Sequence, residues 1–387
     1  MWDNRTKGLL PPIRRELLRK IAWMLLVVLA VCGSLALFLF PEVINLDALR
    51  RRVKYWNISE EELGNYSFDD HNSNAYGSLN GGLAVASVGG LSTYRADGTE
   101  LVVSQAQMGL PQLQVGKQIA MAYDVGGTTL LAVEANGGEV LRVSSEKAIL
   151  DADLSPDGSL CYMTSAAGYK SVLAVYDHRQ ELIYRWLSSS TYMPLCAIGP
   201  EGKTVATVGL DQHAGSFEST LNLFRTDSEE ITKTVSLGNQ LIYELTYLDN
   251  GGICAIGESG VQIFDEQAEP IGTYSYEDKY LKDYHCGGDG FLTLSLNMYR
   301  AGNRYWLMTV NESGEEIASV YIGEEILDLS VCGKYIAVLT NGGLTIYNRS
   351  LDIYAETETA DQATAVLMRE DGSALLLGAG RGRLYIP

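Results

Sequence analysis

One β-hairpin pattern recurs along the chain and constrains its fold more than any other feature. Each copy has an alternating apolar strand that ends in Tyr, Phe or Val, a short polar turn, and a second apolar strand. The copies begin at Leu91, Leu130, Leu173, Leu221, Val261, Trp306 and Leu344. A second hairpin precedes several of them, and Asp-Gly turns such as Asp157-Gly158 favour tight reversal of its strands. Each unit therefore supplies four short strands about every 40 residues, which predicts the blades of a β-propeller.

The last repeat predicts how the ring closes. After Ala365 the sequence supplies three strands, so the eighth unit lacks its outermost strand. A short strand-like piece at 65–68 precedes the first complete unit, which begins near Ala75. We expect this piece to complete the last blade from the outside, because that pairing leaves no free sheet edge. The sequence thus predicts an all-β domain over residues 65–387 with eight four-stranded antiparallel blades, and seven blades as the alternative.

An uncharged run of 20 residues, 21–40, precedes the repeats. As a helix it is about 30 Å long, which matches the hydrocarbon core of a membrane. A cleaved signal peptide has a shorter apolar core, about 7 to 15 residues, and then a small-residue cleavage site that this run lacks. A lipoprotein-type Cys32 is a further alternative, although Val31 stands where a small residue is needed. The run predicts one uncleaved transmembrane helix.

Positive charge sets the predicted orientation. Residues 1–20 contain six Lys or Arg residues and two acidic ones, and basic flanks stay on the cytoplasmic side. The linker 41–64 weakens this asymmetry with a basic cluster: Arg50, Arg51, Arg52 and Lys54. We interpret the cluster as membrane-proximal, at the outer headgroups, with a solvated linker helix as the alternative. The prediction is a single-pass protein of the cytoplasmic membrane, held in the lipid by its anchor, with its N-terminus inside and its repeat domain outside.

Charge and motifs exclude several function classes. Residues 1–54 carry +6 and the whole chain −19, so residues 55–387 carry −25, a field that repels nucleic acid. The five cysteines of the domain have no metal-binding spacing, and no Gly-x-Ser-x-Gly or zinc-protease motif occurs. The acidic run from Asp151 resembles a calcium loop but has Pro156 and Tyr162 where the loop needs Gly and Glu. We therefore predict no metal, no cofactor and no catalytic residues.

Loop lengths predict where a binding surface lies. In a propeller, the loops between second and third strands emerge on the same face as the connections between blades. Three of the former loops are long, at 165–171, 209–220 and 297–304, and loops carry binding sites more often than scaffolds do. Exposed tyrosines there would suit a protein, peptide or envelope-glycan partner, whereas tyrosines buried in strands are the alternative. The predicted binding residues are Tyr169, Tyr192, His213, Phe217, Tyr276, Tyr280, Tyr299, Arg300 and Arg304.

Two functions from different classes fit these patterns. The first, which we favour, is a non-enzymatic binding or scaffold module with an envelope or membrane protein as its partner. The alternative is a propeller-type lyase or glycosidase that uses carboxylates in the central channel. Its candidate acids are Asp151, Asp153, Glu244 and Asp328, which surface or turn positions would explain equally well.

The order of segments also carries a resemblance. A basic N-terminus, one span, the stretch INLDALRRRVKYW and the first-blade sequence NGGLAVASVGGLSTYRADGTEL follow one another. This arrangement resembles a family of uncharacterised single-pass membrane β-propeller proteins from Clostridia-like Gram-positive bacteria. The resemblance covers nearly the whole chain. It implies topology and a bacterial envelope, and it supplies no activity and no site residues.

Overall fold

The structure is a computed structural model that describes residues 20–21, 23–28, 31, 46–56, 65–213, 215–360 and 362–387. The chain divides into two compact units, residues 1–56 and 57–387, and each is described by itself. Most of the predicted span 21–40 lies outside the described residues. Within the described part of the chain, no helix combines the length and the apolar character that a membrane crossing needs.

Helix α2 (Leu46–Lys54) contains the basic cluster of the linker. Asp47 stands in its first turn, where a negative charge interacts favourably with the helix dipole. Arg50 Nη1 lies 3.9 Å from Asp47 Oδ1, three residues earlier on the same face of the helix. The arginine cluster is therefore part of a short helix, with Arg50 and Arg52 exposed.

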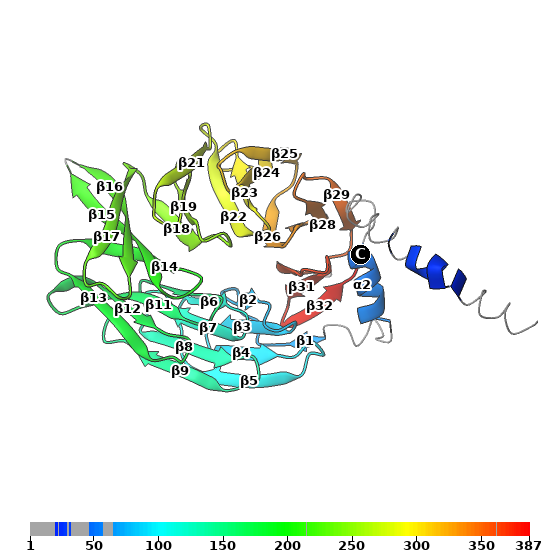
Figure 1. The fold of residues 1–387 in the computed structure, drawn as a ribbon, viewed down its shortest axis with the longest axis horizontal. Helices are drawn as coiled ribbons and strands as arrows, with labels where there is room; N and C mark the ends of the chain where they lie inside the picture. Colours follow the sequence, from blue (N-terminus) through cyan, green and yellow to red (C-terminus); the bar gives the residue numbers. More distant parts are fainter. Residues whose placement is uncertain are drawn as a thin grey trace, which may run out of the picture. The chain divides into compact units, whose positions relative to one another are not determined.

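The second unit is an eight-bladed β-propeller in which every blade is a four-stranded antiparallel sheet, as predicted. Figure 1 shows the blades following one another in chain order, from β2 in cyan to β32 in red. From the innermost to the outermost strand, blade 1 consists of β2 (Ala75–Gly77), β3 (Leu83–Ser87), β4 (Gly90–Tyr94) and β5 (Glu100–Gln105). Blade 2 consists of β6 (Pro111–Val115), β7 (Ile119–Asp124), β8 (Thr129–Glu134) and β9 (Glu139–Ser144). Blade 3 consists of β10 (Asp151–Leu154), β11 (Leu160–Ala166), β12 (Tyr169–Tyr176) and β13 (Leu182–Ser188). Blade 4 consists of β14 (Tyr192–Ile198), β15 (Thr204–His213), β16 (Ser216–Arg225) and β17 (Ile231–Gly238).

The second half of the ring repeats this plan. Blade 5 consists of β18 (Ile242–Tyr247), β19 (Ile253–Gly257), β20 (Gly260–Phe264) and β21 (Pro270–Ser275). Blade 6 consists of β22 (Tyr280–Gly288), β23 (Phe291–Asn297), β24 (Tyr305–Asn311) and β25 (Glu316–Ile322). Blade 7 consists of β26 (Ile326–Cys332), β27 (Tyr335–Thr340), β28 (Gly343–Asn348) and β29 (Ile353–Thr357). Blade 8 consists of β30 (Ala365–Met368), β31 (Ala374–Gly378), β32 (Arg381–Tyr385) and β1 (Tyr66–Ser67).

The N-terminal strand closes the ring, as the sequence predicts. Strand β1 pairs with β32 in antiparallel register, Tyr66 opposite Gly382 and Ser67 opposite Arg381. Tyr66 is fully buried, and its ring meets Tyr94 of blade 1 edge to face at 6.0 Å between centroids. The closing strand thus joins blade 8 to blade 1 through side chains as well as through its backbone.

The core consists of side chains packed between neighbouring blades. Second strands are covered on both faces, so β7 and β23 are buried along their whole length and read as continuous apolar runs. Outermost strands lie at the rim. In β21, exposed and half-buried residues alternate from Ile271 onward. One cluster joins Ala206 and Leu223 of blade 4 to Leu245 and Phe264 of blade 5.

Each blade presents two kinds of connection on opposite faces. The turns between first and second strands and between third and fourth strands form one face, here called the hairpin face. The turn of blade 3 is typical: Gly158 has φ +94°, and the Ser159 N–H donates to Asp157 Oδ1 at 2.9 Å. The connections between second and third strands and between consecutive blades form the other face, here called the loop face.

Two of the three long loops predicted on the loop face are strand extensions. Strands β15 and β16 stay paired out to His213 and Ser216, so 209–220 is a projecting hairpin. Strands β11 and β12 likewise pair out to Ala166 and Tyr169, which leaves a tight turn within 165–171. Paired strands therefore make up most of the length of both segments. Of the three, 297–304 alone is a loop, between β23 and β24.

Candidate functional site

Large aromatic side chains stand at the loop-face ends of strands in four consecutive blades. Each is between 39% and 53% exposed, although aromatic rings of this size are usually more buried. With the two arginines described below, they form the surface that we call the aromatic patch. Its rings are Tyr169, Tyr192, Phe217, Tyr243, Tyr280 and Tyr299.

Strand direction explains why these residues share one face. Tyr192, Tyr243 and Tyr280 stand at or next to the first residue of an innermost strand, where the chain enters a blade from the loop face. Tyr169 and Phe217 begin or nearly begin third strands, which run in the same direction as the innermost strand. The alternating strand direction within each blade therefore brings residues from distant parts of the sequence to one surface.

The loop of blade 6 adds positive charge to this surface. The guanidinium of Arg300 lies 5.5 Å from the centre of the Tyr280 ring, and that of Arg304 lies 5.9 Å from the centre of the Tyr299 ring. Both distances suit a cation–π interaction. Burial and the charge of Glu258 raise the pKa of the Tyr243 hydroxyl, and the positive charge of Arg300 opposes them. Arg300 therefore lies over a ring of blade 6, and its charge also acts on a ring of blade 5.

Hydrogen bonds fix the backbone of that loop. Asn297 is fully buried, and its Nδ2 donates to the Gly302 carbonyl at 2.6 Å while its Oδ1 accepts from the Tyr299 N–H at 3.1 Å. Lys282 Nζ donates to the Arg300 carbonyl at 2.6 Å. The loop thus presents Arg300 and Tyr299 from an anchored backbone, which reduces the entropy lost when a partner binds.

The predicted binding residues differ in their exposure to solvent. Tyr169, Tyr192, Phe217, Tyr280 and Tyr299 are exposed on the loop face. Tyr243 joins them, a residue whose place near the start of β18 was the available sequence signal. The side chain of His213 lies outside the described residues.

The expectation that Tyr276 lies at the exposed rim is wrong. Tyr276 is only 1% exposed and packs with Ile256 and Leu294 in the core between blades 5 and 6. It follows β21 directly, and the turn at 277–278 has positive φ values that direct the chain onward into blade 6. Its ring therefore fills the seam between the blades and offers no binding surface.

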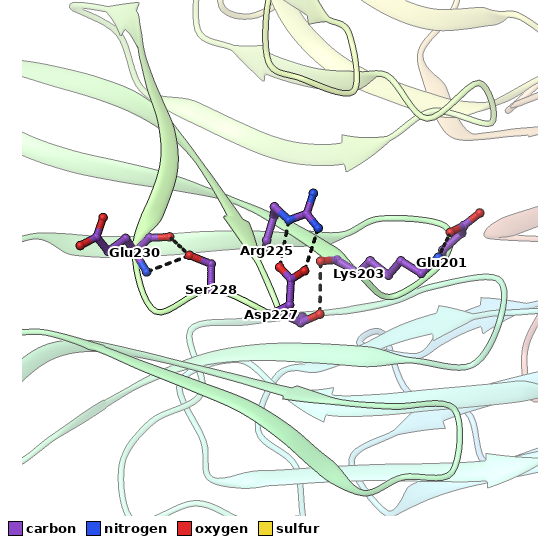
Figure 2. Close-up of polar contacts among 7 residues, drawn as sticks. Glu201, Lys203, Arg225, Asp227, Ser228 and Glu230 are labelled. Atoms are coloured by element: carbon purple, nitrogen blue, oxygen red, sulfur yellow. Dashed lines mark hydrogen bonds and ion pairs between the residues drawn. The ribbon is translucent and has the colours of Figure 1, made fainter.

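The hairpin face differs in the way that its charges are paired. Figure 2 shows two neighbouring turns of blade 4, where Arg225 forms two bonds to Asp227, at 2.9 and 2.7 Å. Lys203 bonds to Glu201 at 2.5 Å, and its carbonyl accepts from Thr226 of the neighbouring turn. These charges pair within their own turns, so this region of the hairpin face is a suitable control surface for the aromatic patch.

A second candidate site lies inside the ring. Five carboxylates of the described residues, on innermost strands of blades 3, 5, 6 and 7, are partly exposed to the central channel: Asp151, Asp153, Glu244, Asp283 and Asp328. The sequence identifies four of them and missed Asp283. Asp283 follows a register shift near the start of its innermost strand, as Glu244 and Asp328 do in theirs. An acidic residue near the start of an innermost strand was therefore the available sequence signal.

Several of these acids hold neighbouring blades together. Asp151 Oδ2 accepts from the Cys196 N–H and Asp153 Oδ2 from the Ile198 N–H, both at 2.8 Å, across the seam between blades 3 and 4. At the seam between blades 7 and 8, Asp328 Oδ2 accepts from the Val366 N–H at 2.7 Å. These contacts give the acids a structural role that is independent of any chemistry in the channel.

Burial changes the ionisation of the channel acids. It raises the pKa of Asp151 to about 7, of Asp153 to about 6 and of Asp328 to about 7. Burial, followed by the charges of Asp151 and Asp153, raises the pKa of Glu244 to about 8. Burial also raises the pKa of Asp283 to about 6. These pKa values lie near neutral pH, the range that suits a general acid or base.

A cavity of about 560 Å³ opens where the channel meets the hairpin face. Asp153, Thr246 and Tyr247 line it together with the turn residues Lys117 and Asp249. Among the described residues, no group of three or more His, Cys, Asp or Glu side chains is arranged to hold a metal ion. The cavity brings one channel acid, Asp153, within reach of a small molecule.

The fold and the two candidate sites define a class of protein, an eight-bladed β-propeller with WD40-like repeats. Residues 54–377 match the profile of a family of unknown function (DUF5711), and the chain belongs to that family. No curated protein matches the chain.

Solved structures confirm the architecture. The chain is similar to the C-terminal WD40 domain of Sif2, with 11% identity, a TM-score of 0.56, and coverage of 84% of this chain and 97% of that one. It is also similar to the Dos1 propeller, with 13% identity, a TM-score of 0.57, and coverage of 84% and 95%. At these identities the likeness shows the fold alone.

Proposed function

We propose that the chain is a membrane-anchored, extracytoplasmic binding module that docks a protein partner on its aromatic patch. The observation that carries this proposal is the exposure of six aromatic rings on the loop face of blades 3 to 6. Aromatic residues, Met and Arg are the residue types enriched in protein interfaces, and Met298, Arg300 and Arg304 accompany the rings.

Charge favours a protein over an anionic glycan. Residues 55–387 carry −25, a field that repels anionic polymers at a distance. The patch itself adds the positive charges of Arg300 and Arg304, and Lys282 beside it adds a third. A protein with acidic groups placed opposite these three side chains and apolar groups opposite the rings matches both features.

The anchor is proposed from sequence. The uncharged run 21–40 is long enough to span a bilayer, and the basic residues of 1–20 favour a cytoplasmic N-terminus. This orientation places the propeller outside the cytoplasmic membrane, where envelope and membrane proteins are the available partners.

Site-specific crosslinking tests the proposal in cells that make the full chain. A photoreactive residue in place of Tyr299 is expected to capture a defined protein, and one in place of Lys203 on the hairpin face is not. The captured protein is then titrated against the full chain in lipid nanodiscs. Capture of a polysaccharide, or of nothing, at position 299 contradicts the proposal.

A triple variant provides the quantitative test. Tyr243→Ala, Tyr280→Ala and Arg300→Ala together are expected to weaken binding of that partner by about tenfold or more, because central aromatic and Arg side chains dominate interface energies. The matched control, Lys203→Ala with Arg225→Ala, removes two exposed cations from the hairpin face. Equal affinity of the triple variant and the control contradicts the proposal.

The near-neutral pKa values of Glu244 and Asp151 favour one second candidate, a lyase or glycosidase that acts in the channel. This function predicts turnover of an envelope glycan or uronic acid by the full chain, lost in Glu244→Gln and retained in the patch variant. Absence of turnover over a panel of such substrates leaves the binding module as the function.

A further inference from the structure

Four of the five cysteines in the propeller form two thiol pairs. Besides burial, the Cys161 thiol raises the pKa of Cys196, and the Cys254 thiol raises the pKa of Cys286. All four are free thiols in the structure, as is Cys332. Cys161 and Cys196 belong to one core cluster, and Cys286 packs against the cluster that contains Cys254.

The two pairs occupy the same place in the propeller repeat. Cys161 and Cys254 are each the second residue of a second strand, in blades 3 and 5. Cys196 and Cys286 each stand two residues before the end of the innermost strand of the next blade. Cys161 and Cys196 therefore lie across the seam between blades 3 and 4, where strands β11 and β14 approach within 8 Å between Cα atoms. Cys254 and Cys286 lie across the seam between blades 5 and 6, where Cys286 packs against the cluster that contains Cys254.

Another seam shows what ordinary packing looks like at this place. Between blades 4 and 5, Ala206 and Leu245 lie in one core cluster at the corresponding positions. A small residue and a larger apolar one fill that seam, whereas the other two seams have a cysteine at both positions. A buried cysteine can act as a small apolar residue, but that role does not require a second cysteine opposite it.

We propose that Cys161–Cys196 and Cys254–Cys286 are sites of disulfide formation, and that the two bridges staple blade 3 to blade 4 and blade 5 to blade 6. The inference is supported by the proposed extracytoplasmic location, since disulfides persist in oxidising compartments. Cys332 has no such counterpart among the described cysteines and remains a thiol.

The chemistry is thiol–disulfide exchange with the disulfide of an extracytoplasmic oxidoreductase or of glutathione. One thiolate attacks the oxidant's disulfide and releases one thiol, and the paired cysteine then displaces the second thiol from the mixed disulfide. The two cysteines lose two electrons and two protons, and one disulfide of the oxidant becomes two thiols. Burial raises the pKa of Cys161 and Cys196, so the exchange proceeds before the seam closes during folding.

Peptide mapping of the full chain tests the pairing. Membranes are solubilised with N-ethylmaleimide to block free thiols, and the protein is digested with trypsin without reduction. Trypsin cuts after Lys170 and Arg179 and after Lys279 and Lys282, so both pairs fall on separate peptides. The expected result is two linked peptide pairs, 161 with 196 and 254 with 286, and a Cys332 peptide that carries the label. Label on all five cysteines, or any other pairing, overturns the proposal.

A refolding experiment separates the pairing from the location. Reduced full chain is refolded in a glutathione redox buffer and mapped in the same way. Bridges in this arm but not in protein from cells support the pairing and contradict the extracytoplasmic location. Absence of bridges in both arms overturns the pairing and leaves the binding function to its own test.

Thermal unfolding supplies a second readout. The bridges close loops of about 30 to 35 residues, and each is expected to raise the midpoint temperature by about 5 °C relative to reduced protein. Cys332→Ala is the matched control and keeps this difference. Cys161→Ala with Cys254→Ala abolishes it, and persistence of the difference in that double variant overturns the proposal.

Discussion

Asp151 accepts a hydrogen bond from the backbone N–H of Cys196, 2.8 Å away and 45 residues later in the chain. The bond crosses the seam between blades 3 and 4, and the same carboxyl group accepts the Tyr123 hydroxyl of blade 2 at 3.0 Å through its other oxygen. One side chain thus ties together three consecutive blades around the channel. Asp328 makes the equivalent bond to Val366 between blades 7 and 8.

Removing this acceptor is expected to destabilise the propeller. Asp151→Ala leaves the Cys196 N–H and the Tyr123 hydroxyl without their partner, which costs about 1 to 3 kcal/mol for a buried donor. Asp151→Asn keeps an acceptor and should cost less. Urea unfolding of the full chain measures both, with the exposed Asp249→Ala as control. Equal stability of the Asp151→Ala variant and the control would contradict the role assigned to this carboxylate.

Raising the pH is expected to destabilise the propeller between about pH 6.5 and 8. The pKa of Glu244 is raised to about 8 and those of Asp151 and Asp328 to about 7, so the native state holds protons that the unfolded chain releases. Unfolding therefore releases protons in this window, and a higher pH favours it. His285, whose pKa burial lowers to about 4, has the opposite effect only below about pH 6.5.

Urea midpoints at several pH values across this window check the dependence. The midpoint should fall as the pH rises, and Glu244→Gln should flatten the slope because it removes the group with the highest pKa among the channel acids. A midpoint that rises over this window would rule out the assigned protonation of the channel.

Loss of the closing strand's aromatic side chain is expected to open the ring. Tyr66 is fully buried, packs against Tyr94 and accepts a hydrogen bond from Arg369 Nη2 at 3.2 Å. Tyr66→Ala should cost about 3 to 5 kcal/mol, as for other large-to-small changes of buried aromatic residues. Ser67→Ala, in the same strand but exposed, is the control. Chemical unfolding measures the loss, and a cost within about 0.5 kcal/mol of the control, the usual spread of surface changes, would argue against closure by β1.

Charge placed in the apolar run is expected to release the protein from the membrane. Leu26→Arg with Val28→Arg adds two charges, each of which costs about 3 kcal/mol at the centre of a spanning helix. The variant should move from the carbonate-resistant membrane fraction to the soluble or degraded fraction. Ile353→Arg on the exposed outer strand of blade 7 is the control. If the double variant is retained in the membrane as well as the control is, the anchor proposal is contradicted.

Much of the fold is predictable from local pattern. The hairpins from Leu91 to Leu344 alternate with the period of two that half-buried strands impose, and Asp-Gly turns such as Asp157-Gly158 join the strands of the hairpins that precede them. Even the closing strand at Tyr66 was predictable, because the last unit lacked one strand. These features depend on residues that are close in sequence or on a count of repeats.

The aromatic patch was predictable only in part. Strand direction places Tyr192 and Tyr280 on the loop face, and the sequence pattern contains that direction. Whether a ring at the face lies outward or folds into a seam is not contained in the pattern. Tyr280 is 39% exposed, whereas Tyr276, four residues earlier, is 1% exposed because it packs in the core cluster between blades 5 and 6.

The sequence by itself determined the blade, the repeat and the closure, since hydrophobic alternation and turn chemistry are local properties. Only the tertiary structure decided which residues meet across the seams. Asp151 with Cys196, Asp328 with Val366, and Cys161 with Cys196 in one core cluster each join different blades. Such contacts depend on how far adjacent blades rotate and approach, and that geometry is set by the packing of all the side chains between them.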